Sequence, residues 1–267
     1  VLRCNGVTLA RSDPLGLFRS LAGVVLPDSL LVLPRRYHLP PVALPGSEKY
    51  QQGGVAMAAA VGESEEFISL RDYRQGDPLR HMHWRSWAKV GKPIIKEFQD
   101  EFFVRHALIL DTFTDDPRSE LFEEAVSVAA SFACALQTQE SLLDLMFVGP
   151  KAYCFTGGRG LAHTDQMLEI LASVGVCRHE PFTALETLVL DHLSLVSGCV
   201  CVLIAWDETR RQFIKRLRAM GVPLLVLVVA EPDLAAPLDP GPLRDEPASF
   251  HVLPVDAVAE ALHKIPG

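Results

Sequence analysis

Apolar runs of strand length alternate with amphipathic helical patterns from residue 104 to the end of the chain. The runs, of which CVCVLIAWD at 199–207 is typical, predict strands that are buried on both faces. Between them, apolar residues at helical spacing predict helices. The predicted strands are 104–113, 142–149, 152–158, 199–207 and 223–229; the predicted helices are 118–139, 163–175, 183–197 and 209–221; a final strand and helix fill 250–265. This alternation predicts an α/β fold, with a mostly parallel sheet covered by helices on both faces.

Residues 1–66 follow a different pattern. Short runs rich in proline, glycine and β-branched residues predict strands and turns, and the small polar residues of 47–66 predict a flexible connection. We therefore expect three parts: a β-rich segment and linker over 1–66, a joining stretch over 67–103, and an α/β domain over 104–267. Because the chain opens on Val1, already inside a strand pattern, we expect the β-rich segment to be cut short.

The formal net charge is −8, and it is unevenly distributed. Residues 1–100 hold 13 basic and 10 acidic side chains, whereas the remaining residues hold 12 and 23. General nucleic-acid binding needs an excess of basic groups, so this balance argues against it. A mildly basic first part and an acidic second part favour docking of the two parts against each other or against a protein partner. The sequence contains no G-x-S-x-G, no H-E-x-x-H and no zinc-type cysteine spacing, so it does not predict an enzyme. A hydrolase that uses the carboxylates named below is a minor alternative.

Two helix features carry specific predictions. Thr209 stands at the start of the helix over 209–221 and is the expected N-cap, while Gly221 is the expected stop. The basic segment RRQFIKRLR, residues 210–218, predicts a helix face exposed to solvent.

The most unusual stretch is FISLRDYRQGDPLRHMHWRSWAKVGKPIIKEFQ, residues 67–99, in which four arginines and two tryptophans lie close together. Asp77 followed by Pro78 predicts the start of a helix, and Gly91 predicts its end. The expected apolar stripe of this helix consists of Leu79, Met82, Trp87 and Val90. A strand is expected in KPIIKEFQ.

This stretch resembles the signature of the bacterial family called domain of unknown function fifty-eight, in which R-[DE]-Y-x-x-G-D-x-x-R precedes a tryptophan and a strand ending in E-F. The resemblance continues upstream in DPLGLF, residues 13–18, and downstream through a von Willebrand factor A-like, Rossmann-like domain. It therefore covers essentially the whole chain. Two departures are His83, where the family usually has Asp, and Lys89, where it usually has Arg.

The mixed charges of the signature stretch favour an internal clasp that fastens the β-rich part to the α/β domain. Arginine forks can be satisfied by nearby carboxylates, and a tryptophan offers a flat face to a guanidinium. A partner-docking surface and a ligand pocket are the alternatives. The candidate residues are Arg71, Asp72, Tyr73, Arg74, Gly76, Asp77, Arg80 and Trp84.

The resemblance to von Willebrand A-like domains also implies a metal site at the carboxyl ends of the strands, where a D-x-S-x-S loop, a Thr and a further Asp bind Mg²⁺ or a similar cation. Here Asp111 keeps the first position, but Phe113 replaces the first Ser and Asp115 the second. Asp207 matches the later Asp, and Thr183 or Thr187 would supply the Thr. Because phenylalanine cannot bind a metal, we expect a degenerate site and no required cofactor, with a bound divalent cation as the alternative.

The leading hypothesis is a non-enzymatic protein-interaction module. The resemblance implies a parent protein with membrane-spanning helices ahead of Val1 and a part that faces the cytoplasm. It also implies a MoxR-type AAA+ ATPase as partner, in an assembly or chaperone-like role. The alternative is a ligand-binding domain of the adhesion type, which depends on a divalent metal at Asp111, Asp115, Thr183 and Asp207.

Overall fold

The computed structural model describes residues 2–25, 28–40, 67–77, 79–98, 105–116, 119–136, 142–157, 161–232 and 238–265. The chain divides into two compact units, one formed by residues 1–47 and 105–267, the other by residues 48–104. Each unit is described separately below. In the described part of the chain, no helix is both long enough and apolar enough to cross a membrane.

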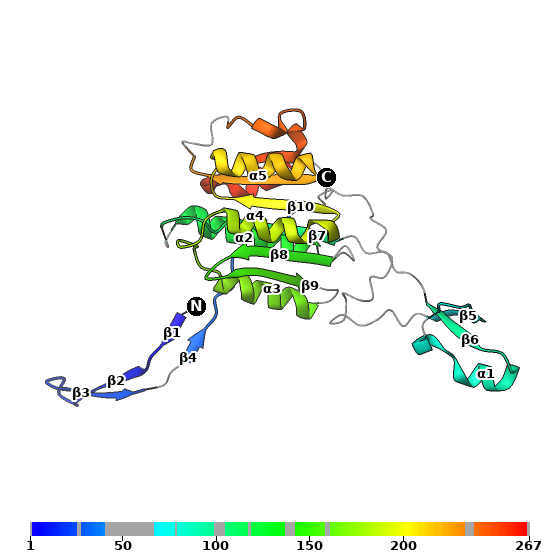
Figure 1. The fold of residues 1–267 in the computed structure, drawn as a ribbon. Coiled ribbons are helices and arrows are strands. Elements are labelled where there is room, and N and C mark those ends of the chain that lie inside the picture. The colour runs from blue at the N-terminus through cyan, green and yellow to red at the C-terminus, as the bar shows by residue number, and fades with distance from the viewer. Residues whose placement is uncertain are drawn as a thin grey trace. The chain divides into compact units, whose positions relative to one another are not determined.

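The larger unit is built on a six-stranded sheet (Figure 1). Its strands run in the order β12-β11-β10-β7-β8-β9 and are all parallel except β9, which pairs with β8 in the antiparallel direction. Their bounds are β7 Arg105–Leu110, β8 Leu142–Val148, β9 Ala152–Gly157, β10 Gly198–Leu203, β11 Leu224–Ala230 and β12 Phe250–Pro254. The central strands are buried throughout, as continuous apolar runs require. The predicted α/β fold with a mostly parallel sheet is confirmed.

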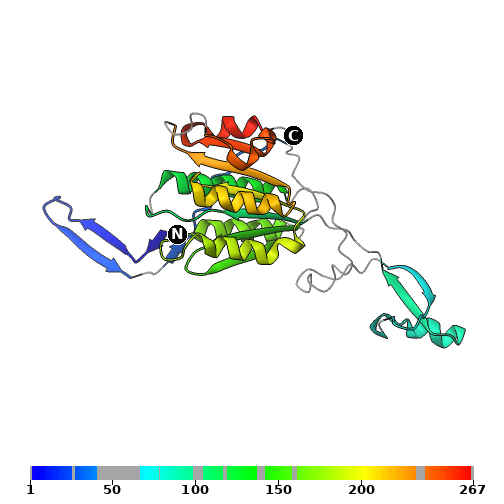
Figure 2. The same ribbon diagram turned by 45° about the horizontal axis from the view of Figure 1, so that its top comes forward.

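Helices cover both faces of this sheet (Figures 1 and 2). One hydrophobic core joins the sheet to α2 Glu120–Leu136, α3 Leu161–Ser173 and α6 Val258–His263. The other core joins it to α4 Thr183–His192 and α5 Glu208–Ala219. Neighbouring strand residues alternate between the two cores: Leu108 belongs to the first and Ile109 to the second. The helix that follows β7 therefore lies on the opposite face from the helix that follows β10.

The predictions of the end of β10, of the N-cap of α5 and of a solvent-exposed position for Arg210 are wrong. The strand β10 ends at Leu203, so residues 204–207 form a loop instead of a strand. The N-cap of α5 is Asp207, whose side chain accepts a hydrogen bond from the backbone N–H of Arg210, and Thr209 is already inside the helix. Arg210 is also not on a solvent-exposed face, because only 8% of its surface is accessible. Aspartate is at least as favourable at an N-cap as threonine, so local sequence does not distinguish Asp207 from Thr209, and the path of the loop before α5 decides which of them caps the helix.

The N-terminal segment is β-rich, as predicted. β1 Leu2–Cys4 pairs with β4 Asp28–Leu30, and β2 Val7–Ser12 forms an antiparallel hairpin with β3 Arg19–Val24. Gly16, at the tip of the hairpin, has φ 69°, a left-handed conformation that glycine adopts without strain.

The segment that follows β4 contacts the sheet unit through Tyr37. Its backbone N–H donates to Ser131 Oγ on α2 over 2.8 Å, and its hydroxyl donates to Glu124 Oε2 over 2.5 Å. Burial and the hydrogen bond to Glu124 raise the pKa of Tyr37 to about 12. This contact ties the N-terminal segment to α2.

The smaller unit contains a two-stranded antiparallel ribbon, β5 Phe67–Asp72 with β6 Ile94–Phe98. Between the strands lie a 3₁₀ turn, η1 Leu79–His81, and a short helix, α1 Trp84–Val90. The prediction of one helix starting at Asp77 is wrong, because Met82 forms a bridge to Ile95 of β6 and interrupts it. Gly91 ends α1 with φ 71°, as predicted. Of the expected apolar stripe, Met82 is buried, whereas Leu79 and Val90 are more than half exposed.

Candidate functional site

The candidate site lies at the carboxyl ends of β7 and β10, two neighbouring strands at the centre of the sheet. From β7 the chain continues to one side of the sheet, through α2 to β8, and from β10 it continues to the other side, through α5 to β11. The strand order therefore reverses between β7 and β10. In open α/β sheets, the loops at such a switch point diverge and leave the usual position for a ligand.

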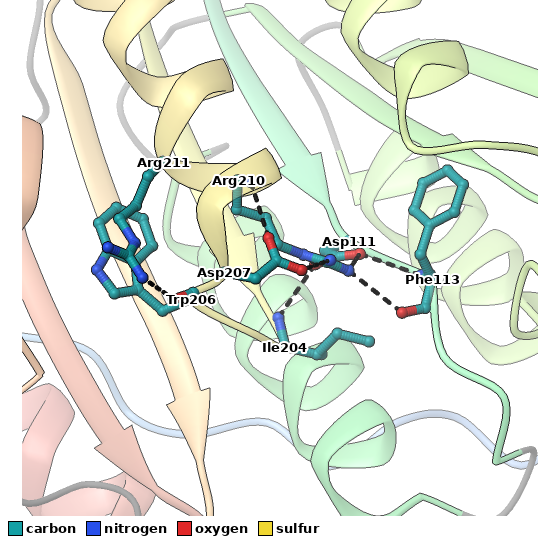
Figure 3. Close-up of polar contacts among 7 residues, drawn as sticks. All are labelled: Asp111, Phe113, Ile204, Trp206, Asp207, Arg210 and Arg211. Atoms are coloured by element: carbon teal, nitrogen blue, oxygen red, sulfur yellow. Dashed lines mark hydrogen bonds and ion pairs between the residues drawn. The ribbon is translucent and has the colours of Figure 1, made fainter.

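Asp111 directly follows β7 and is fully buried. Its Oδ1 accepts hydrogen bonds from the backbone N–H of Phe113 and from Nη2 of Arg210, over 3.0 and 3.2 Å (Figure 3). Its Oδ2 accepts from the backbone N–H of Ile204 and from Nε of Arg210, over 3.4 and 2.8 Å. A carboxylate has about four acceptor positions, so these four bonds occupy its capacity.

Arg210 reaches this carboxylate from the first turn of α5. Besides its two bonds to Asp111, its Nη1 donates to Asp207 Oδ2 over 2.6 Å and its Nη2 donates to the carbonyl of Phe113 over 3.3 Å (Figure 3). Asp207 at the same time caps α5 through its Oδ1. One guanidinium therefore joins the loop after β7 to the loop after β10.

Aromatic side chains enclose the guanidinium. The Cζ of Arg210 lies 4.8 Å from the centre of the Phe182 ring, at the start of α4. Phe182 in turn contacts Phe113 and Phe213, with ring centres 5.3 and 5.6 Å apart. A guanidinium facing an aromatic ring is attracted by the negative face of the ring, and more strongly where water is excluded.

The environment shifts the pKa of both members of the pair. Burial raises the pKa of the Asp111 carboxyl, and the charge and hydrogen bonds of Arg210 oppose this shift. Burial disfavours the charged form of Arg210, but Asp111 and Asp207 outweigh it and hold the pKa of Arg210 above its usual value. Arg210 is therefore a permanent cation at this position.

Of the four predicted metal ligands, the structure brings only Asp111 and Asp207 together, and it does so through Arg210. Asp115 is exposed, as are Thr183 and Thr187, and the Thr187 hydroxyl donates to the carbonyl of Thr183 within α4. Among the described residues, no group of three or more His, Cys, Asp or Glu side chains is arranged to hold a metal ion.

The signature stretch contains a second charged cluster. Arg71 donates two hydrogen bonds to Asp77, Nη1 to Oδ2 over 2.7 Å and Nη2 to Oδ1 over 2.9 Å. Asp77 Oδ2 also accepts from the backbone N–H of Arg74. The hydrogen bond from Arg71 is the main reason why the pKa of Asp77 is lowered to about 2. This pair closes the turn after β5 within the smaller unit.

The other signature residues surround this turn. The N–H of Tyr73 bonds to the Pro93 carbonyl, and Gly76 has φ 108°, which side chains rarely adopt. Asp72 offers its backbone carbonyl to Arg71. Arg80 Nε donates to His81, and Trp84, 62% exposed, stacks on Trp87 with ring centres 5.3 Å apart. These contacts are local, and the predicted clasp between the two parts of the chain stays a prediction.

Sequence reasoning missed Arg210, which it assigned to an exposed basic helix face. The signal was present in the spacing Asp207-x-x-Arg210, since a residue three positions after an N-cap can turn its side chain back toward the cap. An arginine at that spacing, next to an aspartate that ends a neighbouring central strand, is the pattern to look for.

Comparison with known proteins agrees with the resemblance seen in the signature stretch. A protein of Bacillus subtilis (strain 168), named "Uncharacterized protein YeaD", is 27% identical over 170 residues, which are 63% of this chain and 41% of that protein. The chain thus matches less than half the length of this relative. The family model described as "Protein of unknown function DUF58" matches residues 69–236, from the signature stretch through β11 and more than half of the chain. The chain belongs to this family.

Proposed function

We propose that this chain is a non-enzymatic protein-interaction module. The observation that carries the proposal is the β2–β3 hairpin, in which both strands are exposed along their whole length. Five of its large apolar side chains are between 60 and 79% exposed: Leu9, Leu15, Leu17, Phe18 and Leu21. An isolated two-stranded hairpin is marginally stable in water, and a group of large exposed apolar side chains is typical of a docking site.

The charged centre of the larger unit supports the same proposal. Asp111 is enclosed and fully hydrogen-bonded, so its carboxylate is not free to act as a general base or a nucleophile. The exposed Trp84 in the smaller unit adds a second surface that a partner can contact. For the partner we propose a MoxR-type AAA+ ATPase, and for the parent protein a membrane anchor with this part facing the cytoplasm. Both follow from the family resemblance alone.

The experiment is a pull-down with the purified cognate MoxR-type ATPase, with and without ATP. We expect capture by the wild-type chain and at least a tenfold loss in the Leu17→Ser/Phe18→Ser variant. Met220→Ser is a matched control, because Met220 is also a large apolar residue that is 60% exposed, but it lies at the C-cap of α5 and not on the hairpin. Folding of each variant is checked by circular dichroism.

The outcomes separate the two parts of the proposal. If the wild-type chain ignores the ATPase in both nucleotide states, the proposed partner is wrong. If capture occurs but the hairpin variant binds as well as the Met220→Ser control, the hairpin is not the docking surface. Membrane association of the parent protein is tested separately, by fractionation of cells that express the full-length protein.

A further inference from the structure

The family resemblance implies a divalent metal ion at the carboxyl edge of the sheet, whereas the structure has the guanidinium of Arg210 between the two carboxylates. A metal site of the adhesion type needs carboxylate and hydroxyl oxygens that converge on an open position with free lone pairs. At the switch point of this sheet, the two carboxylates converge on the guanidinium of Arg210, with N···O distances of 2.8 Å to Asp111 and 2.6 Å to Asp207. The residues present therefore do not fit a divalent metal while Arg210 holds this position.

The acceptor capacity of Asp111 supports this conclusion. Each of its oxygens already accepts two hydrogen bonds, one from the backbone and one from Arg210. A metal ion could bind only by displacing the guanidinium. Displacement is unfavourable because only 9% of the Arg210 side chain is accessible and it would lose its bonds to Asp111, Asp207 and the Phe113 carbonyl at once.

The surrounding side chains also favour a guanidinium over a metal. Phe113 replaces a coordinating serine, and its ring packs on Phe182, whose face lies against Arg210. An aromatic ring stabilises a planar, weakly hydrated guanidinium, whereas a divalent ion would need water molecules in that space. Phe113, at the position where the resemblance implies a coordinating serine, and Arg210 are therefore parts of one arrangement.

We propose that Arg210 is a built-in cation that replaces the divalent metal at the carboxyl edge of the sheet. It ties the loop after β7 to the loop after β10, so that this edge keeps one conformation in the absence of metal. This inference goes beyond the proposed function and does not depend on it. It also implies that removing the guanidinium leaves two carboxylates, the buried Asp111 and the half-exposed Asp207, free to bind a cation.

The test is a calorimetric titration with MnCl₂ of four EDTA-treated and dialysed proteins: the wild type, Arg210→Ala, Asp111→Asn/Arg210→Ala and Arg105→Ala. We expect no binding by the wild type up to 10 mM. We expect Arg210→Ala to bind one Mn²⁺ with a dissociation constant on the order of 10⁻³ M or tighter, as weak oxygen sites do. Its melting temperature should rise by about 3–6 °C at ten times that constant.

The two further variants test whether Mn²⁺ binding by Arg210→Ala depends on the carboxylates around Arg210. Asp111→Asn/Arg210→Ala should lose the acquired binding, because one of the two carboxylates is gone. Arg105→Ala is the matched control, since it removes another buried arginine–aspartate pair, that of Arg105 with Asp144 on β8, and should gain no Mn²⁺ binding.

Each result decides the proposal. One Mn²⁺ bound by the wild type in the millimolar range or below would overturn it, because the site would then accept a metal in the presence of Arg210. A folded Arg210→Ala that binds no Mn²⁺ would also overturn it, because the guanidinium would not occupy a cation site. If Arg210→Ala folds only in the presence of MnCl₂, the proposal is supported; if it does not fold at all, the wild-type titration decides.

Discussion

The strongest energetic consequence of the structure is that Arg210 and Asp111 must depend on each other. In Arg210→Met the apolar volume is kept, but a fully buried carboxylate loses two of its four hydrogen bonds and its counter-charge. Breaking a buried pair in this way costs about 3–5 kcal/mol. The lost contact between the guanidinium and the Phe182 ring adds about 0.5–2 kcal/mol. We expect a total loss of about 3.5–7 kcal/mol of unfolding free energy, a large fraction of the stability of a typical domain.

A double-mutant cycle separates the charge effect from packing. Asp111→Asn leaves Arg210 paired with Asp207, so we expect the smaller loss of about 1.5–3 kcal/mol that is typical of a hydrogen bond to a charged group. In Asp111→Asn/Arg210→Met no charge is left uncompensated at Asp111. We therefore expect the double variant to be about 2–3 kcal/mol more stable than the sum of the two single losses predicts.

The assay is urea unfolding followed by circular dichroism at pH 7 and pH 5. Without Arg210, only the two backbone hydrogen bonds still oppose the effect of burial on Asp111, so its folded-state pKa rises further above the unfolded value. A carboxyl whose pKa is raised on folding favours the folded state most when protonated, so the deficit of Arg210→Met should shrink as the pH falls from 7 to 5. A loss below about 1 kcal/mol, additive losses in the cycle, or a deficit independent of pH would refute the reasoning.

Three further predictions concern other contacts. Arg105→Ala should cost about 3–5 kcal/mol in urea unfolding, because Asp144 is fully buried and accepts two bonds from Arg105; a loss under about 1 kcal/mol would contradict this. Arg71→Ala should raise the carboxyl pKa of Asp77 from about 2 toward 4 in a ¹³C NMR titration, and an unchanged titration midpoint would disprove the pairing. In the wild type, the stabilisation from this pair is complete above about pH 4 and is lost as the pH falls toward 2. Tyr37→Phe should cost about 1–2 kcal/mol, because a hydroxyl bond to a carboxylate on α2 is lost, and an unaltered urea midpoint would contradict this.

Much of the fold could be predicted from local patterns. Continuous apolar runs placed the four central strands β7, β8, β10 and β11, because a strand covered on both faces can contain few polar residues. The secondary structure of the smaller unit was harder to predict from local patterns. Its helix was predicted to start at Asp77, but Asp77 binds Arg71, and Met82 pairs with β6. Both contacts join parts of the chain that local spacing does not relate.

In the candidate site, too, local sequence predicted one part of the arrangement and tertiary contacts decided the other. The family resemblance assigned Asp111 and Asp207 to the carboxyl ends of two strands, although β10 ends at Leu203 and Asp207 belongs to the loop that caps α5. What the sequence by itself determined is that a carboxylate follows each of two apolar strands, and thus that two carboxylates stand at one edge of a parallel sheet. It could not determine the charge between them, because an arginine in the first turn of a helix has the same local pattern whether it faces solvent or a buried aspartate. Only the tertiary structure decided this: the reversal of strand order brings the start of α5 beside the end of β7, and a buried carboxylate needs a cation within hydrogen-bond distance.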